Sequence, residues 1–152
     1  MVREHPGLQL RLHATPKAAT DLRSALRDWL AEVGASEQEI FDVALACSEA
    51  FANAVGHPLK PATLIVDVEA TVNSGRLLTL VVRDYALAHP ERSLDETRMF
   101  LRLMETLVES AESHARPDGV TLVLRRRLGS GRIPPRAAVA GRWARILPGP
   151  PT

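Results

Sequence analysis

The sequence has 152 residues, of which 45% are hydrophobic and 24% are charged, and such values are ordinary for one compact domain with a sizeable core. The net charge of +1 excludes the strongly basic composition of many proteins that bind nucleic acid or anionic membranes. No apolar run approaches the roughly 18 to 20 residues that span a bilayer, and no apolar signal segment follows the charged N-terminus. We therefore expect a single cytoplasmic domain.

The first elements are one strand and two helices. Apolar and polar residues alternate in Gly7–Ala14, which predicts a half-buried strand. In Lys17–Val33 the apolar residues recur every three or four positions, which predicts an amphipathic helix. Ser36 and Glu39 have the spacing of a capping box, so a second helix should begin there and run to about Gly56.

A hairpin is predicted in the middle of the chain. Residues of Ala62–Val72 alternate between apolar and polar, turn residues follow at Asn73–Gly75, and Arg76–Asp84 provides a second strand. Tyr85–Arg92 has no periodicity and is predicted to be a loop.

The last predicted elements are a helix and a strand. Ser93 and Glu96 form another possible capping box, and apolar residues continue at helical spacing as far as Ala111. Arg116–Gly119 is typical of a turn, and Val120–Leu128 alternates as a strand does.

The order strand, helix, helix, strand, strand, helix, strand predicts an α+β fold. It favours a two-layer α/β sandwich with an antiparallel or mixed sheet and helices on one face, over a doubly wound parallel sheet. Residues 1–128 would form this domain. Residues 129–152 are rich in Arg and Pro and contain no Asp or Glu, so we predict a flexible tail.

Two polar residues of the second predicted helix could carry chemistry. Glu49 and Asn53 lie outside its apolar stripe and are i and i+4 neighbours on one side of the helix. Small residues around them would let this side line a cavity in which a carboxylate and an amide point at one ligand. The alternative interpretation is a solvated helix face, which is the usual place for such residues.

Other polar residues have structural interpretations. Asp42 is interpreted as a surface acid, and Arg125–Arg127 as charges that end an edge or near-edge strand and discourage aggregation. Cys47 is the only cysteine, which excludes an internal disulfide, and its place on the apolar stripe predicts a packed thiol. Five scattered histidines argue against a zinc site.

The run Asp42–His57 resembles the N-box of the histidine-kinase-like (GHKL) ATPases, and most of all that of the bacterial anti-sigma-factor serine kinases. Leu26–Leu30 is similar to the first helix of that family. Asp118–Leu122 together with Arg125–Leu128 resembles its closing strand. The resemblance covers residues 8–128 and implies the two-layer GHKL, or Bergerat, fold.

The resemblance implies a role for each matching residue. Asn53 takes the place of the N-box asparagine that ligates the Mg²⁺ bridging the ATP phosphates, for which an amide oxygen is a suitable hard ligand. Glu49 takes the place of the general base toward the attacking hydroxyl. Asp84 takes the place of the aspartate that accepts a hydrogen bond from the adenine amino group. Thr121 stands roughly at the position where the family has a threonine that supports adenine binding.

Two glycine motifs of the family are missing. Tyr85–Pro90 stands where the family has Gly-x-Gly after the adenine aspartate. Arg98–Leu101 stands where a second glycine motif opens the following helix and offers backbone amides to phosphate. These differences leave open a noncatalytic interaction module on the same fold that has lost nucleotide binding.

The implied function is regulation of transcription. The protein would bind Mg-ATP and a sigma factor, or an antagonist protein that it phosphorylates on serine, and would act as a homodimer without contact to a membrane or to nucleic acid. A hypothesis of a different class is that the acid-free tail binds nucleic acid or an anionic partner.

Overall fold

The computed structural model describes residues 6–55, 65–85 and 94–129. In these ranges the chain forms, in order, β1 (Leu8–His13), α1 (Pro16–Glu32), α2 (Glu37–Val55), β2 (Ile65–Val72), β3 (Leu77–Asp84), α3 (Leu94–Glu105), β4 (Ser110–Arg116) and β5 (Gly119–Arg127). The predicted loop after Tyr85, the capping residue Ser93, the end of the second helix at Gly56 and the predicted tail after Gly129 lie outside the described residues.

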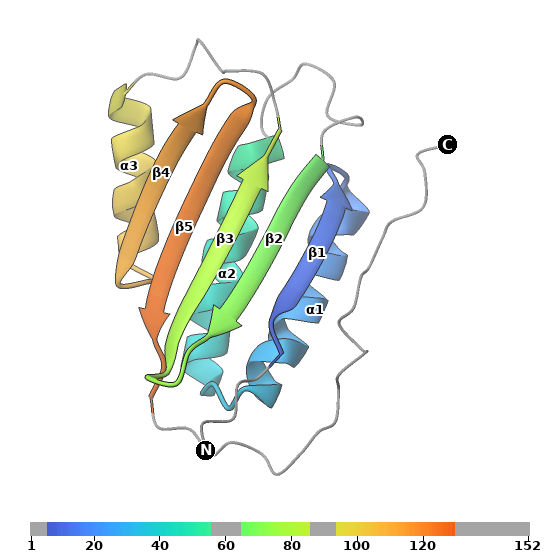
Figure 1. Ribbon diagram of the computed structural model, residues 1–152, viewed down its shortest axis with the longest axis vertical. Coiled ribbons are helices and arrows are strands. Elements are labelled where there is room, and N and C mark those ends of the chain that lie inside the picture. The colour runs from blue at the N-terminus through green and yellow to red at the C-terminus, as the bar shows by residue number, and fades with distance from the viewer. Residues whose placement is uncertain (1–5, 56–64, 86–93, 130–152) are drawn as a thin grey trace.

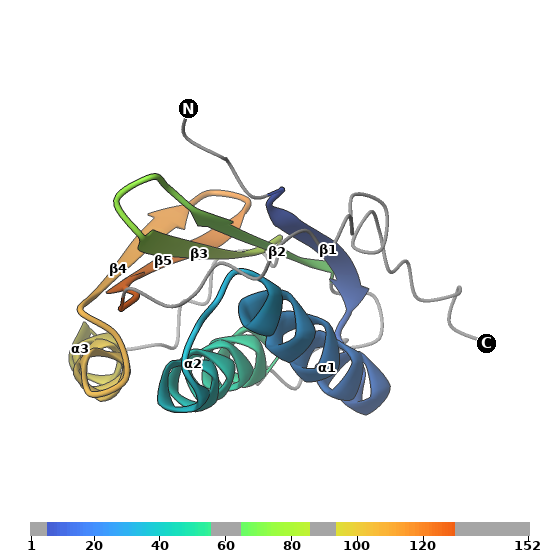
Figure 2. The ribbon, with the colours of Figure 1, turned by 90° about the horizontal axis from the view of Figure 1, so that it is seen from below.

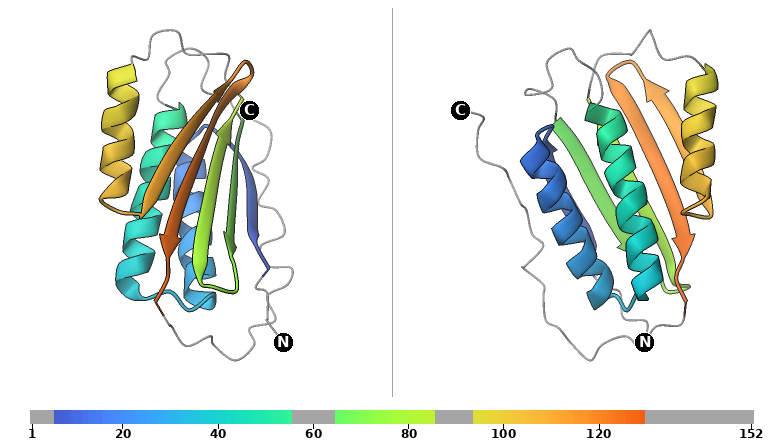
Figure 3. Two further views of the ribbon diagram at one scale, coloured as in Figure 1. Left: turned by 60° about the vertical axis from the view of Figure 1, so that its left-hand side comes forward. Right: turned by 180° about the vertical axis from the view of Figure 1, so that it is seen from behind.

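The five strands form one antiparallel sheet in the order β1-β2-β3-β5-β4. All three helices cover the same face of this sheet, as Figures 1 and 2 show. Seen from behind in Figure 3, α1, α2 and α3 lie side by side across the sheet. The predicted two-layer α+β sandwich is therefore confirmed, and the sheet proves to be wholly antiparallel.

The core lies between the sheet and the helices. Alternate residues of each central strand point toward the helices, so that Leu78, Leu80 and Val82 of β3 are buried. Trp29 of α1 is 1% exposed, and its indole N–H donates to the carbonyl of Pro6 over 2.9 Å. Cys47 is buried in this core, as its place on the apolar stripe predicts, and burial raises the pKa of its thiol to about 12.

The capping residues of the first two helices explain where these helices begin. The Thr15 hydroxyl accepts from the N–H of Ala18 over 3.1 Å at the start of α1. At the start of α2, the Ser36 hydroxyl accepts from the N–H of Glu39 over 3.1 Å, while the Glu39 carboxylate accepts from the N–H of Ser36 over 2.8 Å. This reciprocal pair is the capping box that the sequence predicts.

A cluster of hydrogen bonds joins three segments at the end of the sheet where α2 begins. The other carboxylate oxygen of Glu39 accepts from the N–H of Gly129 over 2.7 Å. The guanidinium of Arg76, in the β2–β3 turn, donates to the carbonyls of Val33, Gly34 and Gly129. Arg76 has φ +64°, an uncommon conformation for a residue other than glycine, and these three bonds offset its cost.

The third helix and the strand after it differ from the prediction. The helix ends at Glu105 instead of continuing to Ala111, and β4 occupies Ser110–Arg116, where no strand is predicted. The reason lies in the composition of β4, which is an edge strand with Ala111, Ser113 and Ala115 on its inner side. Such small and polar side chains give none of the apolar alternation that identifies a strand in a sequence.

Candidate functional site

One flank of α2 carries the two predicted polar residues. Asp42, Glu49 and Asn53 are separated by seven and four positions, so they lie close to one line along a helix of 3.6 residues per turn. Glu49 is exposed and Asn53 is half-buried. The pattern of buried and exposed residues along α2 thus places both side chains at the border of the stripe that packs on the sheet, and not within that stripe.

The contacts of Asp42 show which way this flank faces. Arg126 of β5 donates to the carboxylate of Asp42 over 2.5 Å and to the carbonyl of Leu107 over 2.8 Å, and Leu107 lies just after α3. The bond from Arg126 holds the pKa of Asp42 below its usual range. The flank of α2 with Glu49 and Asn53 therefore faces the side of α3 and β5.

This ion pair corrects two interpretations from the sequence. Asp42 is not a simple surface acid, because its side chain is only 16% exposed and is paired. Arg126 does not project into solvent with its neighbours, because Leu122, Leu124 and Arg126 share the side of β5 that faces the helices. The sequence did contain a signal for the orientation of Arg126, because this residue continues the period of two that Leu122 and Leu124 begin.

The carboxylate of Asp84 lies at the end of β3 and is 5% exposed. One of its oxygens accepts from the N–H of Val120 over 3.1 Å. The neighbouring Gly119 passes so close that a Cβ at this position would lie 2.0 Å from the carbonyl oxygen of Asp84 and 3.0 Å from its carboxylate. Glycine is therefore required where β5 begins, and it allows the backbone to approach the buried acid.

Thr121 is not brought together with the side chain of Asp84. In the sheet Thr121 pairs with Arg83, and adjacent residues of a strand point to opposite faces. Thr121 thus lies on the outer face of the sheet, while Val120 shares the helix-facing side with Asp84. The adenine-supporting role of Thr121 stays a prediction that these contacts do not support.

The end of β3 and the C-terminal end of α2 lie at the same end of the molecule (Figure 1). Since α2 packs against β3, the buried carboxylate at the end of β3 and the amide near the C-terminal end of α2 lie at the same end of the two layers, and the exposed carboxylate lies one helical turn before the amide. The three groups are Asp84, Asn53 and Glu49. Asp84 offers an acceptor for an amino group, Asn53 offers a hard oxygen ligand, and Glu49 offers a base.

Residues 12–126 match the family model of the histidine kinase-like ATPase domain. The chain belongs to this family. It is also similar to the crystal structure of the RsbU and RsbW domains of Rv1364c from Mycobacterium tuberculosis, with 30% identity and a TM-score of 0.67. The match covers 82% of this chain but 33% of that one, so the chain spans about a third of the length of that protein. The resemblance to the anti-sigma-factor serine kinases is thereby confirmed at the level of family and fold.

Membership of the histidine kinase-like ATPase family implies Mg-ATP, and the donor set of this site fits it. The buried carboxylate of Asp84 suits an amino group, and the amide oxygen of Asn53 suits Mg²⁺. Within the described ranges no three His, Cys, Asp or Glu side chains gather as metal ligands. Phosphate oxygens and water would complete the coordination of a Mg²⁺ held by Asn53, as is usual for this ion.

The segments with the altered glycine motifs are described only in part. Tyr85 is exposed, and its hydroxyl donates to Asp67 on the outer face of the sheet over 2.6 Å. Residues 86–90 lie outside the described residues. Arg98–Leu101, which the resemblance aligns with the opening of the helix, lies inside α3, because α3 begins at Leu94.

Sequence reasoning missed two backbone features of the site. The N–H of Val120 and the absent side chain of Gly119 both shape the surroundings of Asp84, although neither has a side-chain function. The Asp118-Gly119 dipeptide signals a turn, but the approach of Gly119 to Asp84, 35 positions earlier, depends on the pairing of β3 with β5.

None of the helices in the described part of the chain is long and apolar enough to cross a membrane.

Proposed function

We propose that this chain is a regulatory protein of the anti-sigma-factor serine kinase type, which binds Mg-ATP at the end of β3 and α2. The observation that carries the proposal is the buried Asp84 with Gly119 against it, at the end of the molecule where α2 presents Asn53. A family match over residues 12–126 supports the same assignment.

Each residue has a defined part in the proposal. Asp84 accepts a hydrogen bond from the adenine amino group in surroundings that exclude most water, where such a bond gives specificity. Asn53 holds Mg²⁺ through its amide oxygen. Glu49, one helical turn away and exposed, takes the proton of a serine hydroxyl that a protein partner brings to it. Bound Mg-ATP would supply the phosphoryl group and the charge neutralisation for its transfer.

The partners belong to the proposal as well. A sigma factor, or an antagonist that competes with it, would bind this chain, and phosphorylation of the antagonist on serine would change which partner is held. Transcription would be regulated in this way. A homodimer in the cytoplasm, without direct contact to nucleic acid, is the state that the resemblance implies.

A noncatalytic interaction module is the second candidate, and one observation favours it. The first turn of α3 carries Asp95 and Glu96. Negative charge at a helix N-terminus is stabilising for the helix but repels a phosphate that would bind there. The chain would then act through its protein-binding surfaces alone.

Calorimetric titration with Mg-ATP and Mg-ADP separates the two candidates. We expect saturable heat from the unmodified chain, and binding weakened at least about tenfold, or about 1.4 kcal/mol, in both Asn53→Ala and Asp84→Asn. Two matched variants should bind normally: Gln38→Ala removes an amide from the other end of α2, and Asp67→Asn neutralises an acid on the opposite face of the sheet.

Absence of heat at millimolar nucleotide would reject the nucleotide site and support the noncatalytic module. Binding that survives in Asn53→Ala and Asp84→Asn would mean that nucleotide binds elsewhere. If binding holds, a phosphotransfer assay on candidate antagonist proteins with Glu49→Gln as the control decides the kinase step, because this variant should bind nucleotide but transfer no phosphate.

A further inference from the structure

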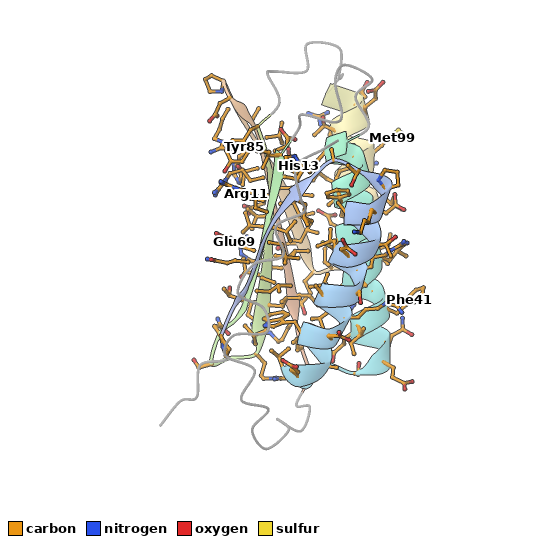
Figure 4. All side chains as sticks on the ribbon, turned by 90° about the vertical axis from the view of Figure 1, so that its right-hand side faces the viewer. Arg11, His13, Phe41, Glu69, Tyr85 and Met99 are labelled. Carbon is orange, nitrogen blue, oxygen red and sulfur yellow. The ribbon has the colours of Figure 1, made fainter. Side chains whose placement is uncertain are left out.

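The solvent side of α2 bears an apolar pair that no described residue covers. Phe41 is 54% exposed and Leu45 is 38% exposed, and at i and i+4 they lie one above the other on the helix. Figure 4 shows Phe41 pointing away from the sheet, on the far side of the helix layer. We call the exposed residues of this side the outer stripe of α2, which consists of Glu37, Gln38, Phe41, Leu45, Glu49 and Ala52.

The outer stripe is acidic as well as apolar. The sequence of α2 contains no Lys or Arg, and Glu37 and Glu49 lie at either end of the apolar pair. The C-terminal half of the neighbouring helix α1 carries Asp28 and Glu32 against one arginine, Arg27. A segment that covers the stripe should therefore combine apolar side chains with positive charge.

The chain leaves the described domain beside the first turn of α2. Leu128 is 3% exposed, and the N–H of Gly129 donates to Glu39, two residues before Phe41. The carbonyl of Gly129 accepts from Arg76 over 3.1 Å, so both polar groups of this residue are held. The segment that follows Gly129 therefore starts at the end of the domain where α2 begins, on the side of this helix that faces the sheet.

The composition of residues 130–152 complements the stripe. These 23 residues contain four arginines and no acid, and their apolar side chains include Trp143, Ile146 and Leu147. At about 3.1 Å per residue in an extended conformation, the 13 residues from 130 to Arg142 reach roughly 40 Å. The outer stripe from Glu37 to Ala52 extends only about 22 Å along the helix. Trp143 can thus reach any point on it.

We propose that residues 130–152 dock in cis on the outer stripe of α2, with Trp143 packed on Phe41 and Leu45 and the arginines beside Glu37 and Glu49. Burial of an aromatic side chain on an exposed apolar pair drives the docking, and the opposite charges fix its position. The docking itself does not depend on nucleotide binding.

The test uses the full chain labelled with 5-fluorotryptophan, whose two fluorine resonances come from Trp29 and Trp143 and are assigned with Trp143→Phe. A soluble paramagnetic agent broadens the resonances that solvent reaches, and Trp29 is an internal reference because it is 1% exposed. We expect the Trp143 resonance to be protected in the unmodified chain. Phe41→Ser/Leu45→Ser should remove that protection, and so should Arg142→Gln/Arg145→Gln.

The matched control is Met99→Ser/Leu103→Ser, which removes an even more exposed i and i+4 apolar pair from α3 (72% and 51% exposed). Protection of Trp143 should persist in it. An exposed Trp143 in the unmodified chain overturns the proposal, and so does protection that survives Phe41→Ser/Leu45→Ser. Protection that disappears on dilution overturns docking in cis and identifies a second copy of the chain as the occupant.

Discussion

Glu39→Gln tests the hydrogen bonds that join α2 to the end of β5. The two carboxylate oxygens of Glu39 accept from the N–H groups of Ser36 and Gly129, over 2.8 and 2.7 Å, and the residue is 9% exposed. Glutamine keeps the shape but replaces one acceptor by an NH₂ group, so one N–H of a partly buried hydrogen bond loses its partner. That loss costs about 1–3 kcal/mol, and the remaining bond loses its charge.

We therefore expect Glu39→Gln to lower the free energy of unfolding by about 2 kcal/mol, which corresponds to a Tm lower by roughly 5–10 °C. Urea denaturation followed by circular dichroism at pH 7 measures the first value. Glu37→Gln is the matched control, because Glu37 lies in the same helical turn but is exposed, and it should change stability by at most about 0.5 kcal/mol.

The pH dependence gives a second check on Glu39. Burial opposes ionisation of this carboxyl group, but the N–H groups of Ser36 and Gly129 outweigh it and hold the pKa of Glu39 below its usual value. A lowered folded-state pKa stabilises the fold above the unfolded-state pKa, and this contribution is lost as the pH falls through the folded-state pKa. The stability difference between the unmodified chain and Glu39→Gln should be constant from about pH 7 to 5 and shrink below about pH 4. Equal stability at pH 7, or a difference that does not change in acid, would refute this reasoning.

Three further predictions concern the site and the core. Gly119→Ala should cost about 2–3 kcal/mol in urea denaturation, because a Cβ 2.0 Å from the carbonyl of Asp84 forces β5 away; a loss under about 0.5 kcal/mol would contradict the close approach. Arg126→Met should raise the pKa of Asp42 in an NMR titration and lower stability by about 1–2 kcal/mol, whereas an unchanged pKa would show that the ion pair is absent in solution. Cys47 should resist iodoacetamide in the folded chain at pH 8 and react once urea unfolds it, because burial raises the pKa of its thiol to about 12.

The parts of the fold that depend on local pattern could be predicted from the sequence. The capping box of Ser36 and Glu39 fixes the start of α2, and the hairpin alternation around Asn73–Gly75 fixes two central strands. The strand β4 could not be predicted, because Ser110–Arg116 is stabilised by pairing with β5 and by no apolar pattern of its own.

The features of the candidate site also separate into those that a local sequence pattern predicts and those that it does not. Glu49 and Asn53 are separated by one helical turn, so their shared side of α2 follows from the sequence alone. The pairing of Asp42 with Arg126 and the approach of Gly119 to Asp84 join residues that are far apart in the chain. The approach of Gly119 to Asp84 follows from the register of β5 with β3, and the pairing of Asp42 with Arg126 follows from the packing of α2 on the sheet, neither of which a local spacing encodes.

The position of β5 inside the sheet has a consequence for synthesis on the ribosome. The last strand of the described residues is not at the edge of the sheet but lies between β3 and β4, and a two-residue turn joins it to β4. Until this final hairpin is made, the nascent β1–β2–β3 sheet presents the unpaired backbone of β3 to other chains. Weakening the terminal hairpin should therefore reduce the yield of folded protein in cells more than it reduces the stability of the molecules that fold, because aggregation competes during that interval.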